Sequence, residues 1–331
     1  MSQPIDRRQV LAGGAALTAA AAATTTAQAQ STQAPDLAGK SILITGCSSG
    51  FGRLGAEYYA SLGAKVFATM RDVPRPEADE LRQLASDEGY DLTVLEIDVT
   101  KPRQITRGVA QAEEAAGGAL DVLVNNAGIS YAGPIEMQDM KATEHMFETN
   151  VFGPHRMAMA ALPAMRARGA GQVFQVSSQL GRLVVPAYGQ YCPTKFALEA
   201  MSEQMAYEVA PQGIEVTIIQ PGGYPTSIWE NSSARTDTLL ERTSDDLKNV
   251  YGPMLGQIME AGAAARNTDP MDIPRAIAEI IAMPAGQAPL RRGVHPTNIP
   301  QTAINQVSEQ TQRAVLDRSG MSAIADAVFN R

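Results

Sequence analysis

Tyr191 and Lys195 have the residue types and the spacing of a proton-transfer pair. Residues four apart on a helix lie one turn from each other and share a face. A phenol with a pKa near 10 is a poor base at neutral pH, and a neighbouring cation lowers that pKa by stabilising the phenolate. We therefore expect Tyr191 to exchange a proton with a substrate oxygen, with Lys195 as its helper. The alternative is an ordinary pair of side chains on a helix surface.

Glycines are concentrated in the segment from Thr45 to Gly52, which reads TGCSSGFG. The segment follows an apolar run and precedes a stretch with helical spacing, so we expect it to join a strand to a helix. Backbone N–H groups at a helix N-terminus attract an anion, and glycine lets a pyrophosphate approach them closely. A tight turn that needs glycine for steric reasons alone is the alternative. The candidate cofactor contacts in this turn are Gly46, Ser48, Ser49, Gly50, Phe51 and Gly52.

The end of the next apolar run, at Met70, bears on the choice of cofactor. About 20 residues beyond the glycines, folds that bind NAD carry an acidic residue on the ribose 2′-hydroxyl. Met70 stands there instead and Arg71 follows, so an arginine is available for the 2′-phosphate of NADP. The sequence thus favours NADP. Asp72 keeps NAD possible, and Arg71 as a solvated loop charge is a further alternative.

Short runs rich in β-branched residues alternate with helical stretches along most of the chain. The candidate strands are residues 41–45, 65–70, 93–98, 121–125, 172–177 and 215–220, with a last one at 289–294. Strands that are apolar throughout belong to a parallel sheet covered on both faces. The alternation predicts an α/β fold, a Rossmann-type doubly wound parallel sheet with ligands at the carboxyl ends of its strands.

Several motifs occur in an order that resembles the short-chain dehydrogenase/reductase family, in its steroid and retinol dehydrogenase branch. They are the T-G-x-x-x-G-x-G turn, Asp98, Asn125-Asn126-Ala127-Gly128, Asn150, Ser177-Ser178, Tyr191-x-x-x-Lys195, and Pro221-Gly222 with Thr226. The resemblance implies that Ser178 hydrogen-bonds the reacting oxygen and that Asn150 holds Lys195 through backbone and ordered water. Asn150, Ser178, Tyr191 and Lys195 are thus the expected catalytic residues. It also implies cofactor contacts from Arg71, Asp98, Val99, Asn125, Ala127, Gly128, Tyr191, Lys195, Pro221, Gly222 and Thr226.

The function implied is an NAD(P)-dependent oxidoreductase that interconverts an alcohol and a ketone or aldehyde by hydride transfer. The segments expected near the nicotinamide, 129–131, 180–188 and 223–229, are mainly apolar or aromatic, which favours a largely apolar substrate. Arg182 could instead serve a carboxylate, although a solvent-facing arginine is the simpler interpretation. The alternatives for the whole protein are an epimerase or dehydratase of the same superfamily and a non-enzymatic cofactor-binding protein.

The strand and helix alternation stops after Pro221-Gly222, and a helical segment at 226–267 follows. Because this segment leaves the sheet beyond the carboxyl end of a strand, we expect it to form a substrate lid; a packed terminal subdomain is the alternative. The predicted organisation is a linker at 30–39, a dinucleotide-binding core with the catalytic residues at 40–225, the lid at 226–267, and C-terminal helices with the last strand at 268–331.

The first 29 residues resemble a twin-arginine signal peptide. Arg7-Arg8 is followed by an Ala-rich apolar run and by Ala27-Gln28-Ala29, which has the form of a signal-peptidase site. The run is shorter than the roughly 20 residues that span a bilayer, so no stable membrane anchor is expected. We expect recognition by the twin-arginine translocase and a periplasmic location. A disordered Ala-rich tail is the alternative.

The composition limits the other possible partners. The net charge is −8, and no block of Lys and Arg is present, which argues against nucleic acid. Cys47 and Cys192 match no zinc, redox or disulfide spacing, and the three histidines are scattered, so no metal site is expected. A small molecule is the expected partner, and a homodimer remains possible.

Overall fold

Seven strands form one parallel sheet in the computed structural model, which describes residues 34–264 and 267–329. The strands are β1 (Ser41–Thr45), β2 (Lys65–Met70), β3 (Leu92–Glu96), β4 (Val122–Asn125), β5 (Gly171–Val176), β6 (Ile214–Pro221) and β7 (Arg291–Val294). Their order in the sheet is β3-β2-β1-β4-β5-β6-β7, and every neighbouring pair is parallel. The predicted Rossmann-type fold is confirmed.

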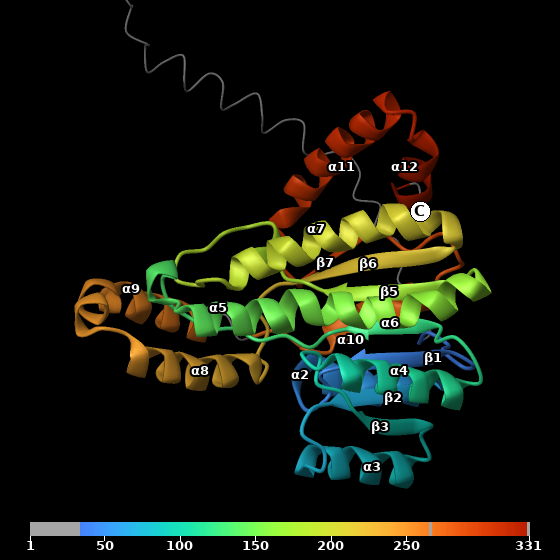
Figure 1. Ribbon diagram of the computed structural model, residues 1–331, viewed down its shortest axis with the longest axis horizontal. Helices are drawn as coiled ribbons and strands as arrows, with labels where there is room; N and C mark the ends of the chain where they lie inside the picture. The colour runs from blue at the N-terminus through green and yellow to red at the C-terminus, as the bar shows by residue number, and fades with distance from the viewer. Residues whose placement is uncertain (1–33, 265–266, 330–331) are drawn as a thin grey trace, which may run out of the picture. The chain divides into compact units, whose positions relative to one another are not determined.

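Helices cover both faces of this sheet (Figure 1). One face packs against α2 (Gly50–Ser61), α3 (Pro76–Glu88) and α10 (Asp272–Ile281), and the other against α4 (Pro102–Ala116), α6 (Gly153–Arg168) and α7 (Tyr191–Val209). Side chains alternate along each strand, so Ile42 and Ile44 enter the first core while Leu43 enters the second. Because both faces are buried, the strands are apolar throughout, which is why they were visible in the sequence.

The strand boundaries agree with the predicted ones to within two residues, and a difference of two occurs at the end of β3 and at the start of β7. The prediction ended the third strand at Asp98, whereas β3 ends at Glu96. The Asp98 carboxylate accepts hydrogen bonds from the Thr100 N–H at 2.9 Å and the Thr100 hydroxyl at 2.7 Å. A short polar side chain that bonds the backbone two residues on favours a turn. Asp98 therefore follows the strand instead of ending it.

The structure places Asn150 in a π-helical turn. This turn, Glu148–Phe152, joins α5 (Met140–Phe147) to α6. A π-turn inserts an extra residue into a helix and is common at functional sites. Here it directs the buried Asn150 side chain toward the segment that follows β4, where it bonds Ile129.

The helices expected beyond residue 226 are α8 (Ile228–Arg242) and α9 (Asp245–Ala264). Three contacts fix them to the segment that follows β4. The Ala132 N–H donates to Thr236 Oγ1 at 2.9 Å, Arg242 pairs with Asp139 at 2.6 Å, and the Tyr251 hydroxyl donates to Glu136 at 2.6 Å. The expected helical tail is present as α11 (Gln301–Arg318) and α12 (Ser322–Phe329).

A buried ion pair connects β7 to α7. Arg291 Nε donates to a carboxylate oxygen of Glu199 at 2.8 Å, and Arg291 also pairs with Glu203 at 2.5 Å. Gln220 donates to the other Glu199 oxygen at 2.8 Å, and Asn305 of α11 donates to Gln220 at 2.7 Å. Burying a charge is costly unless it is paired and hydrogen-bonded, and here both conditions are met for Glu199.

The predicted signal at residues 1–29 and the first part of the 30–39 linker lie outside the described residues. Within the residues that are described, no helix is long and apolar enough to cross a bilayer. The same residues contain no group of three or more His, Cys, Asp or Glu side chains placed to hold a metal ion. Cys47 and Cys192 are buried free thiols.

Candidate active site

A cavity of about 680 Å³ lies at the carboxyl ends of the strands. It is bounded by the glycine turn after β1, by the segments that follow β2 to β7, and by one face of α8. Side chains of Tyr191 and Lys195 from the start of α7 also reach it. This volume is in the range of pockets that bind small molecules and cofactors.

Tyr191 is the first residue of α7, and Lys195 follows one turn later. The Lys195 ammonium lies 5.7 Å from the centroid of the Tyr191 ring and donates a hydrogen bond to the Val176 carbonyl at 2.9 Å. Ser178, just after β5, is hydrogen-bonded to Tyr191 and also accepts from the Leu180 N–H at 3.1 Å. The predicted trio of Ser178, Tyr191 and Lys195 is thus brought together at one wall of the cavity.

The electrostatics of this trio differ from the expectation in one respect. Burial raises the pKa of Tyr191, and the hydrogen bond to Ser178 opposes that rise. Burial lowers the pKa of Lys195 to about 8, while the nearby charge of Glu199 raises it. We expected the lysine to lower the tyrosine pKa, but in the protein alone the loss of hydration is the larger effect. Tyr191 is therefore a protonated phenol at neutral pH, ready to donate.

Asn150 does not bond Lys195 among the described contacts. Its carboxamide accepts from the Ile129 N–H at 2.8 Å, donates to the Ile129 carbonyl at 2.8 Å and donates to Thr194 Oγ1 at 3.1 Å. Thr194 in turn bonds the Tyr191 carbonyl at 2.7 Å. Asn150 thus ties the segment after β4 to the first turn of α7, and we regard it as a positioning residue for Tyr191 and Lys195.

The glycine turn has a shape that fits the diphosphate of a dinucleotide. Gly46 and Gly50 adopt φ angles of +77° and +57°, which side-chain-bearing residues rarely adopt. A Cβ on Gly46 would lie 2.9 Å from the Ala127 Cα, so the turn also packs directly against the segment after β4. The N-terminus of α2 opens into the cavity beside Ser48 and Ser49. Backbone donors and helix dipole therefore face a space suited to an anion.

Gly52 has a different role from the one predicted for it. It does not line the cavity, and a Cβ there would lie 2.3 Å from the Gly46 carbonyl oxygen and 2.5 Å from Asn126 Nδ2. The absence of a side chain therefore lets α2 approach the turn. Gly52 supports the cofactor site through this close packing and not by lining the cavity.

The Gly52→Ala variant is expected to lose at least about tenfold in dinucleotide affinity, because backbone atoms must shift to admit the methyl group. Cofactor titration followed by fluorescence measures this loss. Gly256→Ala is a matched control, since a Cβ at that position on α9 meets open space. Wild-type affinity in the Gly52 variant would contradict the role described here.

Arg71 and Asp72 follow β2, and the structure separates their positions. Arg71 is half-exposed and lines the cavity, whereas Asp72 is not among its lining residues. Asp72 adopts a φ of +58° and lies 3.5 Å from the Arg71 guanidinium. The turn thus presents the arginine to the cavity, as the NADP hypothesis requires.

The sequence model of the family described as short chain dehydrogenase matches residues 40–237. The chain belongs to the short-chain dehydrogenase family. Mouse mitochondrial D-beta-hydroxybutyrate dehydrogenase is 36% identical over 228 residues, which cover 66% of this chain and 64% of that protein. Human retinol dehydrogenase 8 is 31% identical over 280 residues, 82% of this chain and 86% of the human one. The match thus spans somewhat less than two thirds of the mouse relative's length.

A solved short-chain dehydrogenase from Streptomyces avermitilis has the same fold. It superimposes with a TM-score of 0.66 at 28% identity and covers 86% of this chain and 98% of that one. The superposition covers more of this chain than the family-matched region does.

Most residues predicted for the site line the cavity. They are Gly46, Ser48, Ser49, Gly50, Phe51, Arg71, Asp98, Val99, Ala127, Gly128, Ser178, Tyr191, Lys195, Pro221, Gly222 and Thr226. Asn125 does not: it is the last residue of β4, is buried, and donates to the Pro154 carbonyl of α6 at 3.3 Å. Its neighbour Asn126 lines the cavity instead and donates to the Thr45 carbonyl at 2.8 Å.

Three residues from beyond β6 also reach the cavity, of which only Ser227 lies in a segment expected there, 223–229. Ser227, just before α8, donates to the Ser49 hydroxyl at 2.6 Å and so connects the roof of the cavity to the glycine turn. His295, just after β7, lines the cavity and accepts from the Thr297 and Asn298 N–H groups through Nδ1, at 3.2 and 3.0 Å. Arg235 of α8 is a third such residue.

Proposed function

We propose that this dehydrogenase interconverts an alcohol and a ketone or aldehyde with NADP(H) as cofactor. The observation that carries the proposal is the meeting of Tyr191, Lys195 and Ser178 in the same cavity as the glycine turn. The names of the mouse and human relatives, dehydrogenases of a hydroxy acid and of retinol, support the same reaction class. Turnover of cofactor absorbance with a panel of alcohols and ketones tests it, and an inert protein that still binds the cofactor would contradict it.

The residues of the chain account for the proton side of this reaction. When bound, a nicotinamide cofactor supplies or accepts the hydride. Ser178 is placed to hydrogen-bond the substrate oxygen, and Tyr191 donates a proton to that oxygen in reduction or accepts one in oxidation. The Lys195 cation stabilises the phenolate that remains after donation. Asn150 and Thr194 fix the first turn of α7, so the tyrosine does not need to be ordered during the reaction.

The preference for NADP is proposed from Arg71. A charge-assisted bond to the 2′-phosphate contributes about 1.5–3 kcal/mol. The Arg71→Ala variant is therefore expected to bind NADPH about 10- to 100-fold more weakly while its NADH affinity stays nearly unchanged. Parallel titrations with the two cofactors measure the difference. An equal loss for both cofactors would remove Arg71 from the 2′-phosphate site.

The proposed substrate is largely apolar. The wall of the cavity near Tyr191 includes Leu180, Val185, Tyr188, Ile228 and Trp229, and Arg182 is not among the lining residues. A neutral alcohol or ketone can be buried against these side chains without leaving an unpaired charge.

We also propose that the twin-arginine signal directs the folded protein to the periplasm. Changing Arg7 and Arg8 to Lys is expected to retain the protein in the cytoplasm, which fractionation and immunoblotting measure.

A cofactor bound with a micromolar Kd and an association rate constant near 10⁶ M⁻¹s⁻¹ would dissociate in about a second. An exported enzyme that keeps its cofactor therefore needs a nanomolar Kd or lower. Periplasmic protein is therefore expected to release stoichiometric nicotinamide dinucleotide on denaturation. Protein that arrives empty and binds NADP(H) only at micromolar affinity would contradict redox catalysis in that compartment.

A further inference from the structure

Arg235 is a cation on the cavity wall that has no carboxylate partner. It lies on α8, on the helix face that also brings Ile228, Asn231 and Ser232 to the cavity. Within residues 34–256 and 267–329, whose side chains are described, no Asp or Glu forms an ion pair or hydrogen bond with it. The other arginine near the end of the same helix, Arg242, pairs with Asp139 at 2.6 Å. A partly buried guanidinium without a partner is costly, so its position calls for a ligand.

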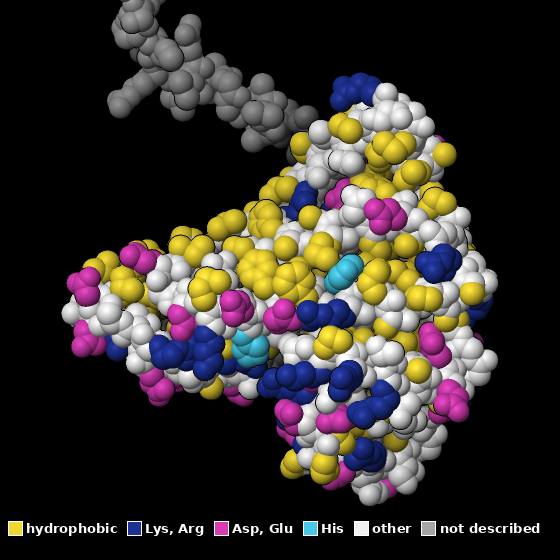
Figure 2. All heavy atoms as spheres, in the orientation of Figure 1, with side chains coloured by type: hydrophobic (Ala, Val, Ile, Leu, Met, Phe, Trp, Pro, Cys, Tyr) yellow, Lys and Arg dark blue, Asp and Glu magenta, His cyan; other side chains and the backbone are white. Residues whose placement is uncertain are grey.

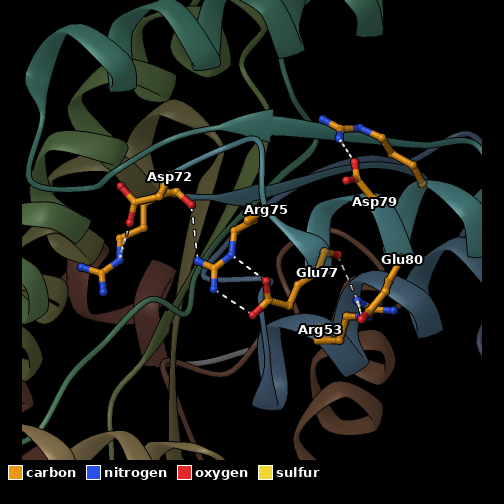
Figure 3. Close-up of polar contacts among 8 residues, drawn as sticks. Arg53, Asp72, Arg75, Glu77, Asp79 and Glu80 are labelled. Atoms are coloured by element: carbon orange, nitrogen blue, oxygen red, sulfur yellow. Dashed lines mark hydrogen bonds and ion pairs between the residues drawn. The ribbon is translucent and has the colours of Figure 1, made fainter.

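Two further arginines line the same cavity, and one of them is already occupied. Arg75 makes a bidentate pair with Glu77, at 2.8 and 2.9 Å, and its third nitrogen donates to the Arg71 carbonyl at 3.4 Å (Figure 3). The hydrogen bond from Arg75 lowers the pKa of Glu77 to about 2. Arg71 has only the long contact to Asp72, at 3.5 Å. Two guanidinium groups, those of Arg71 and Arg235, therefore remain available to a ligand.

These two charges act on each other. Burial lowers the pKa of Arg235, and the charge of Arg71 lowers it further. Both arginines also lower the pKa of His145, after burial as the main cause. Figure 2 shows basic side chains gathered from α8 toward α4, although the chain as a whole is acidic. Two like charges beside one cavity repel each other. An anion bound to both would be attracted by each of them, and these two attractions would offset the repulsion.

We propose that Arg235 is a phosphate-binding residue that acts with Arg71 on one phosphate group of the dinucleotide cofactor. The inference rests on the proposed function, because it takes the ligand to be a nicotinamide dinucleotide. Arg71 binds from the end of β2, and Arg235 binds from α8. A planar guanidinium is suited to bidentate binding of phosphate oxygens. The shared phosphate is the 2′-phosphate of NADP, because the proposed function already assigns that group to Arg71.

The contacts of α8 explain how Arg235 is held in place. Thr236, its neighbour on the helix, accepts the Ala132 N–H, and Ser227 at the base of the helix bonds Ser49 in the glycine turn. Both ends of this part of the chain are thereby attached to segments that themselves line the cavity. Binding by Arg235 would couple α8 directly to the cofactor.

The test is a set of cofactor titrations on the full-length protein, with no substrate present. Arg235→Gln is expected to raise the Kd for NADPH about 10- to 100-fold, the usual value of a charge-assisted bond. Arg242→Gln is the matched control, since it removes an arginine of the same helix that does not line the cavity, and its Kd is expected to stay near that of wild type. Melting temperatures without cofactor show whether each variant is folded.

NADH titrations identify the phosphate. A loss for NADPH alone supports the proposal, because only NADPH carries the 2′-phosphate. An equal loss for both cofactors would place Arg235 on the diphosphate, apart from Arg71, and would overturn the proposal. Arg71→Gln and the double variant complete a cycle in which two arginines on one phosphate should give a non-additive loss.

Two further results would overturn the proposal. They are an unchanged Kd for both cofactors in Arg235→Gln and an equal loss in Arg242→Gln. If the unchanged Kd were accompanied by a raised KM for an anionic substrate, Arg235 would be assigned to the substrate. Failure of the proposed function is distinguishable, because it is measured as absent turnover in the wild-type protein, whereas these titrations measure cofactor binding alone.

Discussion

Replacing Tyr191 with Phe is expected to lower turnover at least about a hundredfold while cofactor affinity changes little. The substitution keeps the ring and removes the only hydroxyl at the start of α7 that is bonded to Ser178. Because burial raises the tyrosine pKa, the native side chain is a proton donor at neutral pH, and phenylalanine cannot replace it. Steady-state turnover and a separate cofactor titration measure the two quantities.

Tyr188 provides the matched control for this variant. It also lines the cavity, its ring centroid is 6.5 Å from that of Tyr191, and burial raises its pKa too. It lacks the bond to Ser178 and the lysine one turn away. Tyr188→Phe is therefore expected to retain turnover within about tenfold of wild type. If both variants lost activity equally, proton transfer could not be assigned to Tyr191.

Lys195→Met should reduce turnover by a similar factor and should also change the pH profile. Methionine preserves much of the lysine stem and removes the charge that stabilises the phenolate. In the native protein, burial lowers the Lys195 pKa to about 8, so the side chain is a cation below this pH and neutral above it. The kcat/KM for the cofactor, which reports groups of the free enzyme, is expected to fall as pH rises through about 8.

The Lys195→Met variant should lose this alkaline limb of the pH profile, the fall in kcat/KM above about pH 8, along with its activity. Lys248 of α9 is partly exposed and pairs with Asp245 at 3.3 Å. Lys248→Met should therefore retain both the rate and the alkaline fall in kcat/KM. An unchanged limb in Lys195→Met would mean that another group titrates there, and the helper role of Lys195 would then rest on the rate alone.

The sheet could be predicted from the sequence because its strands are buried on both faces. Residues such as Ile42, Leu43 and Ile44 are all apolar, since alternate side chains enter different cores. The π-helical turn at Asn150 could not be predicted in this way. It replaces one helical hydrogen-bond pattern with another inside a continuous helical segment, and no residue type marks the change.

The site was predictable where the chemistry depends on local spacing. Tyr191 and Lys195 share a helix face, and the turn containing Gly46 and Gly50 requires positive φ angles. Both features can therefore be recognised from a few neighbouring residues. Asn125 was misplaced because adjacent residues at the end of a strand face different ways, and the sequence did not show which of the two asparagines faces the cavity. Period-two alternation from the buried strand would have been the signal.

Arg235 was missed because its role depends on the phase of a helix whose start was not known. Ile228, Ser232 and Arg235 recur at helical spacing, and once α8 is known to begin at Ile228 the three fall on one face. Arg75 pairs with Glu77, two residues further along the chain, and this local pair leaves Arg71 as the available cation after β2.

The ion pair of Arg291 bears on where this protein can be divided for expression. The family-matched region ends at residue 237, yet Glu199, which follows Lys195 by one turn of α7, has its buried charge neutralised by an arginine at the start of β7. A truncation at the edge of the sequence match would leave that carboxylate uncompensated, which typically costs about 3–5 kcal/mol. The minimal folding unit therefore extends past Arg291, and past Asn305 if Gln220 is to keep its hydrogen bond.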